Sequence, residues 1–279
     1  MKNITPVRIR ILMLEYDFMR HAFAAATIVA LVAGTVGYFL VLRGQTFAGH
    51  ALSHVGFTGA TGAVLIGVPP IWGLVLVTML AGIGMGLLGE KITQRDVAIG
   101  LVLAFALGLG LLFLSFFTAY ATQATTLLFG NVLAVDVRTV WTLLVLAIVS
   151  IVVMAIIARP LLFASLQPDL AEAKGVSLRV YGVLFLAVVA LTTAESAQIV
   201  GVLLVFALMV GPAAAAQRFT TSVASGIVVS ALLALVEAWL GITLAYYTDW
   251  PSSFWIVSLS VAVYLISLVI PNTRLSSRA

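Results

Sequence analysis

Two histidines stand four residues apart in the segment 49–54, Gly-His-Ala-Leu-Ser-His, in a chain with three histidines in all. In a helix, residues at this spacing lie on one face, so the imidazoles of His50 and His54 come together. Two neutral imidazoles can bind a borderline divalent ion such as Zn²⁺. The alternative is a structural pair hydrogen-bonded to the backbone near a helix end. We favour a substrate role for this pair and assign none to His21.

Two acidic residues stand in apolar surroundings. Glu195 lies in the polar segment 192–198 between two apolar blocks, which is either an outside turn without function or part of an entrance that attracts a cation. Glu237 has a long apolar run on each side. Because charge is costly inside a membrane, Glu237 should face the bundle interior or water, or stay protonated. A structural pairing with a Gln or Tyr side chain is the alternative.

The longest polar loop, 167–176, has the pattern of a short helix. A proline stands near its start, and Asp169 and Glu172 fall in its first turn. Lys174 and Gly175 then mark its end, as cations and glycine do at helix C-termini. A capped helix in a loop offers a solvated face to a partner protein, whereas an ordinary connector does not need to be helical.

The composition shows that these residues are carried by a membrane protein. Of 279 residues, 63% are hydrophobic and 9% are charged, against about 45–50% and about 25% in a typical soluble domain. So few charges cannot cover a soluble fold of this size. The absence of Cys excludes a disulfide scaffold, and a net charge of +4 is too small to favour a nucleic-acid partner.

Apolar runs near the roughly 20 residues that a spanning helix needs recur along the chain. They predict an all-α polytopic membrane protein with about nine transmembrane helices, within a range of about 8–10. A tenth apolar patch, 127–135, is too short to span, and we interpret it as re-entrant or interfacial. The nine runs are 22–42, 48–67, 70–89, 97–118, 140–158, 180–194, 199–216, 223–247 and 254–270.

Positive charges divide unevenly between the two sides. With the C-terminus in the cytoplasm, the inside ends and loops carry Arg43, Lys91, Arg95, Arg159, Lys174, Arg179, Arg218, Arg274 and Arg278, and the outside loops carry Arg138. This bias is the one that cytoplasmic loops show. The N-terminal arm, 1–18, adds positive charge outside, so we place it along the membrane interface; one more span is the alternative. Glu15 and Asp17 interrupt any signal peptide.

Glycine spacing predicts close helix–helix contacts, because small residues let helices approach each other in lipid. Two series show it: Gly56, Gly59 and Gly62, and Gly82, Gly86 and Gly89.

Several catalytic signatures are missing from the sequence. It has no phosphate-binding loop of the Gly-x-x-x-x-Gly-Lys-Ser/Thr type, no His-Glu-x-x-His and no Gly-x-Ser-x-Gly. The chain is therefore predicted to be neither an ATPase nor another enzyme, and to hold no permanent cofactor.

Three groups of segments together resemble the zinc/manganese/iron ABC transporter permease family. Their order and spacing match from about residue 15 to about residue 270. The groups are 18–22 with 38–43 and 49–54, then 167–176, then 198–205 with 211–218.

The resemblance implies a single permease domain over 1–279, in the inner membrane of a prokaryote. It implies a homodimer, or a heterodimer with a related chain, served by two cytoplasmic ATPase subunits and an extracytoplasmic metal-binding protein. It also implies that the loop 165–179 is cytoplasmic and that its helix, with Asp169, Glu172, Lys174 and Gly175, couples to the ATPase.

Two positions depart from the family pattern. The family usually has an Asp where this chain has His50, so a hard oxygen ligand and a negative charge are lost. This change shifts the expected preference toward Zn²⁺, with manganese or iron next, or weakens metal binding. The turn before the last span, 249–253, keeps only one of the family's two prolines.

Two other functions remain open. One is an ABC permease of the same fold for a metal chelate or another small solute, with His50 and His54 structural. The other is a self-contained secondary transporter that uses Glu195 and Glu237 as proton or cation sites. The chemistry of a binding-protein partner separates the first alternative from metal import, and flux without an ATPase identifies the second.

Overall fold

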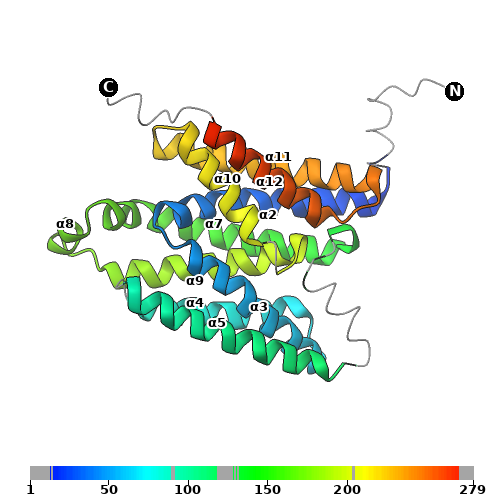
Figure 1. Cartoon of the computed structure of the whole chain (residues 1–279), viewed down its shortest axis with the longest axis horizontal. Helices are drawn as coiled ribbons and strands as arrows, with labels where there is room; N and C mark the ends of the chain where they lie inside the picture. Colours follow the sequence, from blue (N-terminus) through cyan, green and yellow to red (C-terminus); the bar gives the residue numbers. More distant parts are fainter. Residues whose placement is uncertain are drawn as a thin grey trace.

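The computed structural model describes residues 13, 15–88, 92–117, 128, 130, 132–202 and 205–269, without the side chains of 92–95 and 198. In these residues the chain forms α-helices and one short 3-10 helix, η1, and no strand. Figure 1 shows the long helices side by side, with α3 and α10 crossing them obliquely. The elements are α2 (Asp17–Leu42), α3 (Thr46–Leu65), α4 (Pro70–Leu87), α5 (Ile92–Ser115), η1 (Val132–Ala134), α7 (Val137–Leu166), α8 (Pro168–Ala173), α9 (Leu178–Val200), α10 (Val205–Phe219), α11 (Val223–Thr248) and α12 (Ser252–Val269).

Each of the nine predicted apolar runs corresponds to one helix, which confirms the predicted fold class. Seven of these helices, all except α3 and α10, are long and apolar enough to cross a membrane. Helix α3 has 20 residues but carries histidines, threonines and glycines, and α10 has 15. Helices α3 and α10, which lack the length or composition of a lipid-spanning helix, are therefore the two that cross the others obliquely (Figure 1).

Glycines on α4 allow the close contact predicted with a neighbouring helix. A Cβ atom at Gly82 meets the carbonyl oxygen of Leu186 at 2.7 Å, and one at Gly86 meets the Cα atom of Val183 at 2.6 Å. Both partners belong to α9. The series on α3 likewise packs Gly56 and Gly59 against α4, whereas Gly89 lies outside the described residues.

The polar segment 192–198 is part of a helix, so its interpretation as an outside turn is wrong. Helix α9 runs to Val200 and ends at Gly201, whose φ of 78° only glycine adopts easily. Hydroxyl groups fit inside this helix because they can bond to its own backbone, as the Thr193 hydroxyl does to the carbonyl oxygen of Val189 at 2.7 Å. The chain therefore breaks after residue 200, and not before residue 195.

Arginines hold helix ends together at the end of the bundle that carries α8. The Arg43 guanidinium donates to the Ser165 hydroxyl at 2.6 Å and lies over the Phe185 ring. Arg179 donates to the Leu87 carbonyl at 3.2 Å, and Arg218 to the Ser267 carbonyl at 2.7 Å. Cations at helix C-termini bind the carbonyls that have no partner within the helix.

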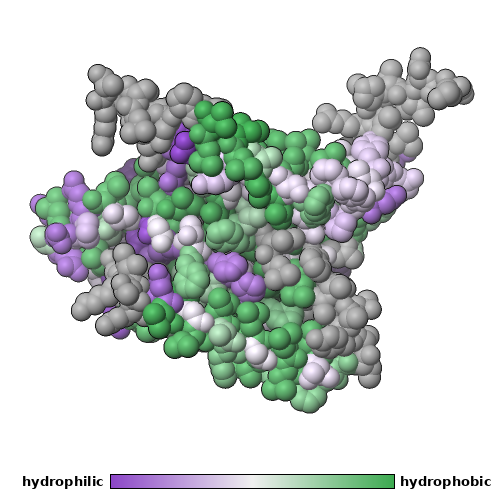
Figure 2. All heavy atoms as spheres, viewed as in Figure 1, coloured by the Kyte–Doolittle hydropathy of each residue, from purple (hydrophilic) through white to green (hydrophobic). Residues whose placement is uncertain are grey.

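The predicted short helix in the longest polar loop is present as α8. Its proline is in the first turn beside Asp169, and Gly175 follows the helix with a φ of 81°. Figure 1 places α8 at the tip of the molecule, and Figure 2 shows hydrophilic side chains gathered there, beside a largely hydrophobic flank. Of the tenth apolar patch, the described part forms η1. Most of the N-terminal arm lies outside the described residues.

Candidate functional site

Helix α3 brings His50 and His54 together, as their spacing predicts. Their ring centroids are 4.7 Å apart and the rings are nearly perpendicular, at 85°. Phe206, at the start of α10, lies 5.4 Å from the His50 ring. No local pattern of residues predicts this aromatic neighbour, because the contact joins residues far apart in the chain. The pair therefore lies where α3 and α10 meet.

The two imidazoles stand on the accessible side of α3. Both histidines are half-buried, and Phe47, one turn before His50, is exposed. The opposite face, including Ala51, Leu52 and Val55, is buried in the core. Because α3 packs mainly against α4 and α5 on its other sides, the histidines face away from those two helices and toward α10.

Two imidazoles make an incomplete metal site. Within the described part of the chain, no group of three or more His, Cys, Asp or Glu side chains is placed to hold a metal ion. The Nδ1 atom of His54 is buried and has no hydrogen-bond partner among the described residues. Structural zinc sites use four ligands, so water or a second chain has to supply the rest here. Such a pair can hold an ion briefly and release it.

Glu195 is deeply buried in α9. It is 0% exposed, and the Ser150 hydroxyl of α7 donates to its Oε1 atom at 3.0 Å. The sequence did not point to Ser150, which lies within a long apolar run. Burial removes Glu195 from any surface entrance in this conformation, so the interpretation as an entrance residue gains no support from the structure.

Glu237 is the second buried acid, in the middle of α11. It is 1% exposed, which agrees with the prediction that it faces the bundle interior, and neither carboxyl oxygen has a hydrogen-bond partner in the described residues. The Ser260 hydroxyl of α12 lies close to this carboxyl group and donates to the Ala207 carbonyl at 2.9 Å. The alternative interpretation, a structural pairing with a Gln or Tyr side chain, therefore has no support in the described residues.

The acidic residues of α8 point into solvent. Asp169, Glu172 and Lys174 are all exposed, and Leu170 between them is 47% exposed. Ala171 is the buried residue of this helix. The arrangement gives α8 one anchored side and one free side with charges and an apolar side chain.

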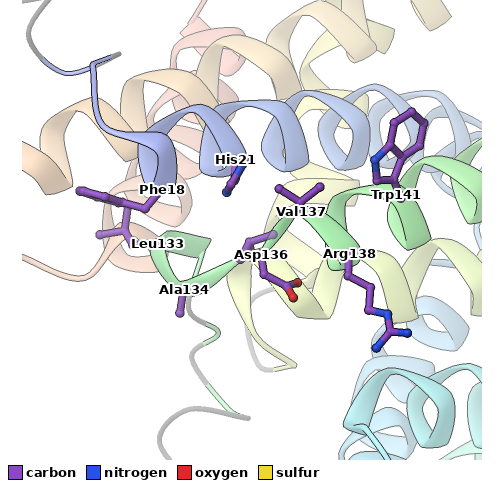
Figure 3. Close-up of a pocket in the computed structure, with 9 residues that line it drawn as sticks. Phe18, His21, Leu133, Ala134, Asp136, Val137, Arg138 and Trp141 are labelled. Carbon is purple, nitrogen blue, oxygen red and sulfur yellow. The ribbon is translucent and has the colours of Figure 1, made fainter.

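An open hollow lies at the other end of the bundle, between α2, η1 and the start of α7. Phe18 and His21 come from α2, and Asp136, Arg138 and Trp141 from the α7 side (Figure 3). Asp136 caps α7 by accepting from the Thr139 backbone N–H at 2.8 Å. Hydrogen bonds from Thr139 hold the pKa of Asp136 below its usual value. This hollow is not predicted by the sequence analysis.

The fold defines the class of the molecule as a polytopic α-helical permease. The chain belongs to the ABC 3 transport family, which it matches over residues 15–271. It is therefore a membrane permease subunit of an ABC transporter, and ATP hydrolysis is carried by a separate subunit, as predicted. Family membership leaves no support for the alternative of a self-contained secondary transporter.

Characterised relatives cover nearly the whole chain. It is 30% identical over 267 residues to the manganese import system permease protein ScaB of Streptococcus parasanguinis, covering 95% of both chains. It is 29% identical to the manganese transport system membrane protein MntC of Listeria monocytogenes, covering 92% of both. These names specify manganese, so the expectation that zinc comes first has no support from the relatives.

Solved structures share the fold. PsaBC from Streptococcus pneumoniae, solved in complex with a Fab, matches with a TM-score of 0.87 and 27% identity, covering 99% of this chain and 100% of that chain. An ABC transporter described as metal-chelate type, in an inward-facing conformation, matches with a TM-score of 0.69 and 15% identity, covering 96% of this chain and 90% of that chain. The second likeness concerns the fold alone.

Proposed function

We propose that this chain is the permease subunit of an ABC importer that moves a divalent transition metal, manganese first, into the cytoplasm. The observation that carries the proposal is the His50–His54 pair, 4.7 Å apart on the accessible side of α3, in a chain whose relatives are named for manganese transport. Two ligands suit a conduit, because a complete tetrahedral site would retain the ion. The cargo is held in transit and is not a resident cofactor.

The proposal includes the subunits that such an importer needs. A second copy of the chain, facing the first across the α3–α10 side, would bring a second His50–His54 pair toward the same path, as a two-fold interface does. Two ATPase subunits bind the end that carries α8, where Arg43, Arg179 and Arg218 also lie. The C-terminus is then cytoplasmic in the inner membrane, and a metal-binding protein delivers the ion at the opposite end.

The direct test uses the transporter purified with its ATPase subunits and binding protein, in lipid nanodiscs. We expect manganese-loaded binding protein to stimulate ATP hydrolysis more than zinc-loaded or empty protein. Stimulation by a chelate and by neither free metal would instead support the chelate permease. The absence of stimulation by manganese, by zinc and by a metal chelate would contradict the proposal.

The missing carboxylate at position 50 provides a second prediction. His50→Asp adds a hard oxygen and a negative charge beside His54, and carboxylate oxygen suits Mn²⁺ better than imidazole does. We therefore expect the ratio of manganese to zinc uptake to rise, by about tenfold if the added ligand is worth about 1.4 kcal/mol. Competition between radioactive manganese and unlabelled zinc measures this ratio. His50→Leu, which adds neither an oxygen ligand nor a charge, is the control and should not raise it.

The exposed acids of α8 provide a third prediction. Changing both Asp169 and Glu172 to Lys reverses the charge of the free side of this helix, and like charges across an interface suppress association. We expect the ATPase subunits to be lost on purification while the permease remains folded. Asp17→Lys, an exposed acid at the opposite end, should leave the ATPase bound. Co-purification of the ATPase with the double variant would contradict the role of α8.

A further inference from the structure

Four buried polar side chains lie on α9 and on the neighbouring helix α7, which packs against it. Ser150, Thr192, Glu195 and Ser196 are each 0% exposed. Thr192 lies three residues before Glu195 and four before Ser196, so it is a neighbour of each of them on the surface of α9. Ser150 reaches Glu195 from α7 through the 3.0 Å hydrogen bond.

Three oxygen atoms in this group have no hydrogen-bond partner among the residues that the structure describes. They are Oε2 of Glu195, Oγ1 of Thr192 and Oγ of Ser196. The neighbouring Thr193 shows the usual behaviour, since its hydroxyl bonds to the carbonyl one turn back. Buried polar atoms are nearly always hydrogen-bonded. Three oxygen atoms without a partner, within about one helical turn, therefore indicate that a water molecule or an ion binds there.

The charge of Glu195 favours an ion of charge +1. A carboxylate inside a membrane protein is costly unless it takes up a proton or a cation accompanies it, and among the described residues Ser150 is its one hydrogen-bond partner. One monovalent cation makes the group neutral, whereas a divalent ion would leave a net positive charge in the same apolar place. The carbonyls at the nearby C-terminal end of α9 add partial negative charge.

The donor atoms narrow the class of ion further. One carboxylate and three hydroxyls offer oxygen only, with no imidazole or sulfur, and oxygen donors select hard cations over borderline transition metals. Oxygen cages of this kind replace the hydration shell of alkali ions. The chemistry therefore differs from that of His50 and His54, which are nitrogen ligands on another helix.

We propose that Ser150, Thr192, Glu195 and Ser196 form a buried site for a monovalent alkali cation of the sodium class. The cation joins α9 to α7 and satisfies the three orphan oxygens. It is not the cargo of the transporter, and it stabilises the helix packing on which α3 and α10 rest.

The test measures the melting temperature of the purified transporter, permease with ATPase subunits, in nanodiscs at constant ionic strength. Sodium chloride replaces choline chloride stepwise. We expect the melting temperature of the wild type to rise and saturate with sodium, and that of Glu195→Gln to be independent of sodium. Glu237→Gln is the matched control, because Glu237 is equally buried without orphan hydroxyls beside it, and it should retain the sodium response.

A second variant keeps the carboxylate and removes one hydroxyl. Thr192→Val should raise the sodium concentration for half-maximal stabilisation by about tenfold, the factor that corresponds to about 1.4 kcal/mol, and it decides the question if Glu195→Gln does not fold. A wild type that melts identically in sodium and choline holds only a proton and water there, and this result would overturn the proposal. So would a sodium response that survives in Glu195→Gln, or an unchanged half-maximal concentration in Thr192→Val.

Discussion

Replacing His50 and His54 together with alanine is expected to abolish manganese and zinc uptake while the permease still assembles with its ATPase subunits. The two rings provide all the imidazole nitrogen on the accessible side of α3, and their centroids are 4.7 Å apart. Removing both leaves the ion without a protein ligand from this helix. Uptake of radioactive metal into cells and co-purification of the ATPase measure the two parts of the result.

The fold should tolerate this double change. Both side chains are half-buried, and the buried Nδ1 atom of His54 has no partner that would be left unsatisfied. His21→Ala is the matched control, because this third histidine lies in the hollow at the N-terminal end of α2 (Figure 3), and its loss should not change uptake. Normal metal uptake by the double alanine variant would disprove the site.

Gly82→Leu is expected to prevent correct folding of the permease. A Cβ atom at this position comes within 2.7 Å of the Leu186 carbonyl oxygen and 2.9 Å of the Ala190 side chain in α9. These atoms cannot move aside as a flexible side chain can, because one belongs to a helix backbone. Overpacking a close contact typically costs about 1–3 kcal/mol, and a leucine in a backbone contact should reach or exceed the upper end of that range.

Helix α4 offers its own control two residues further on. A Cβ atom at Gly84 meets nothing within 4 Å, so Gly84→Leu should fold and transport normally. The yield of monodisperse protein in size-exclusion chromatography and the melting temperature compare the two variants. Equal yields and melting temperatures for both would show that α4 and α9 do not pack as closely as the structure places them.

The site residues that the sequence predicted are set by local spacing, and those it did not predict are set by contacts between helices distant in the chain. The spacing of His50 and His54 guarantees proximity in any helix, but the contact of Phe206 with His50 joins α10 to α3. Ser150 looks like one more residue of an apolar helix until α7 and α9 are placed side by side. The length of α9 also depends on this packing. The polar segment around Glu195 continues the helix, because neighbouring helices bury it.

The sequence by itself determined the membrane setting and the nine helices, because apolar runs in lipid must satisfy their backbone groups internally. It also determined α8, because local capping residues specify a short helix. Only the tertiary structure decided that the chain breaks after α9 at Gly201, that α8 and the arginine-capped helix ends lie at one end, and that Glu195 is enclosed. These features depend on contacts between helices distant in the chain, and no local pattern of residues encodes such contacts.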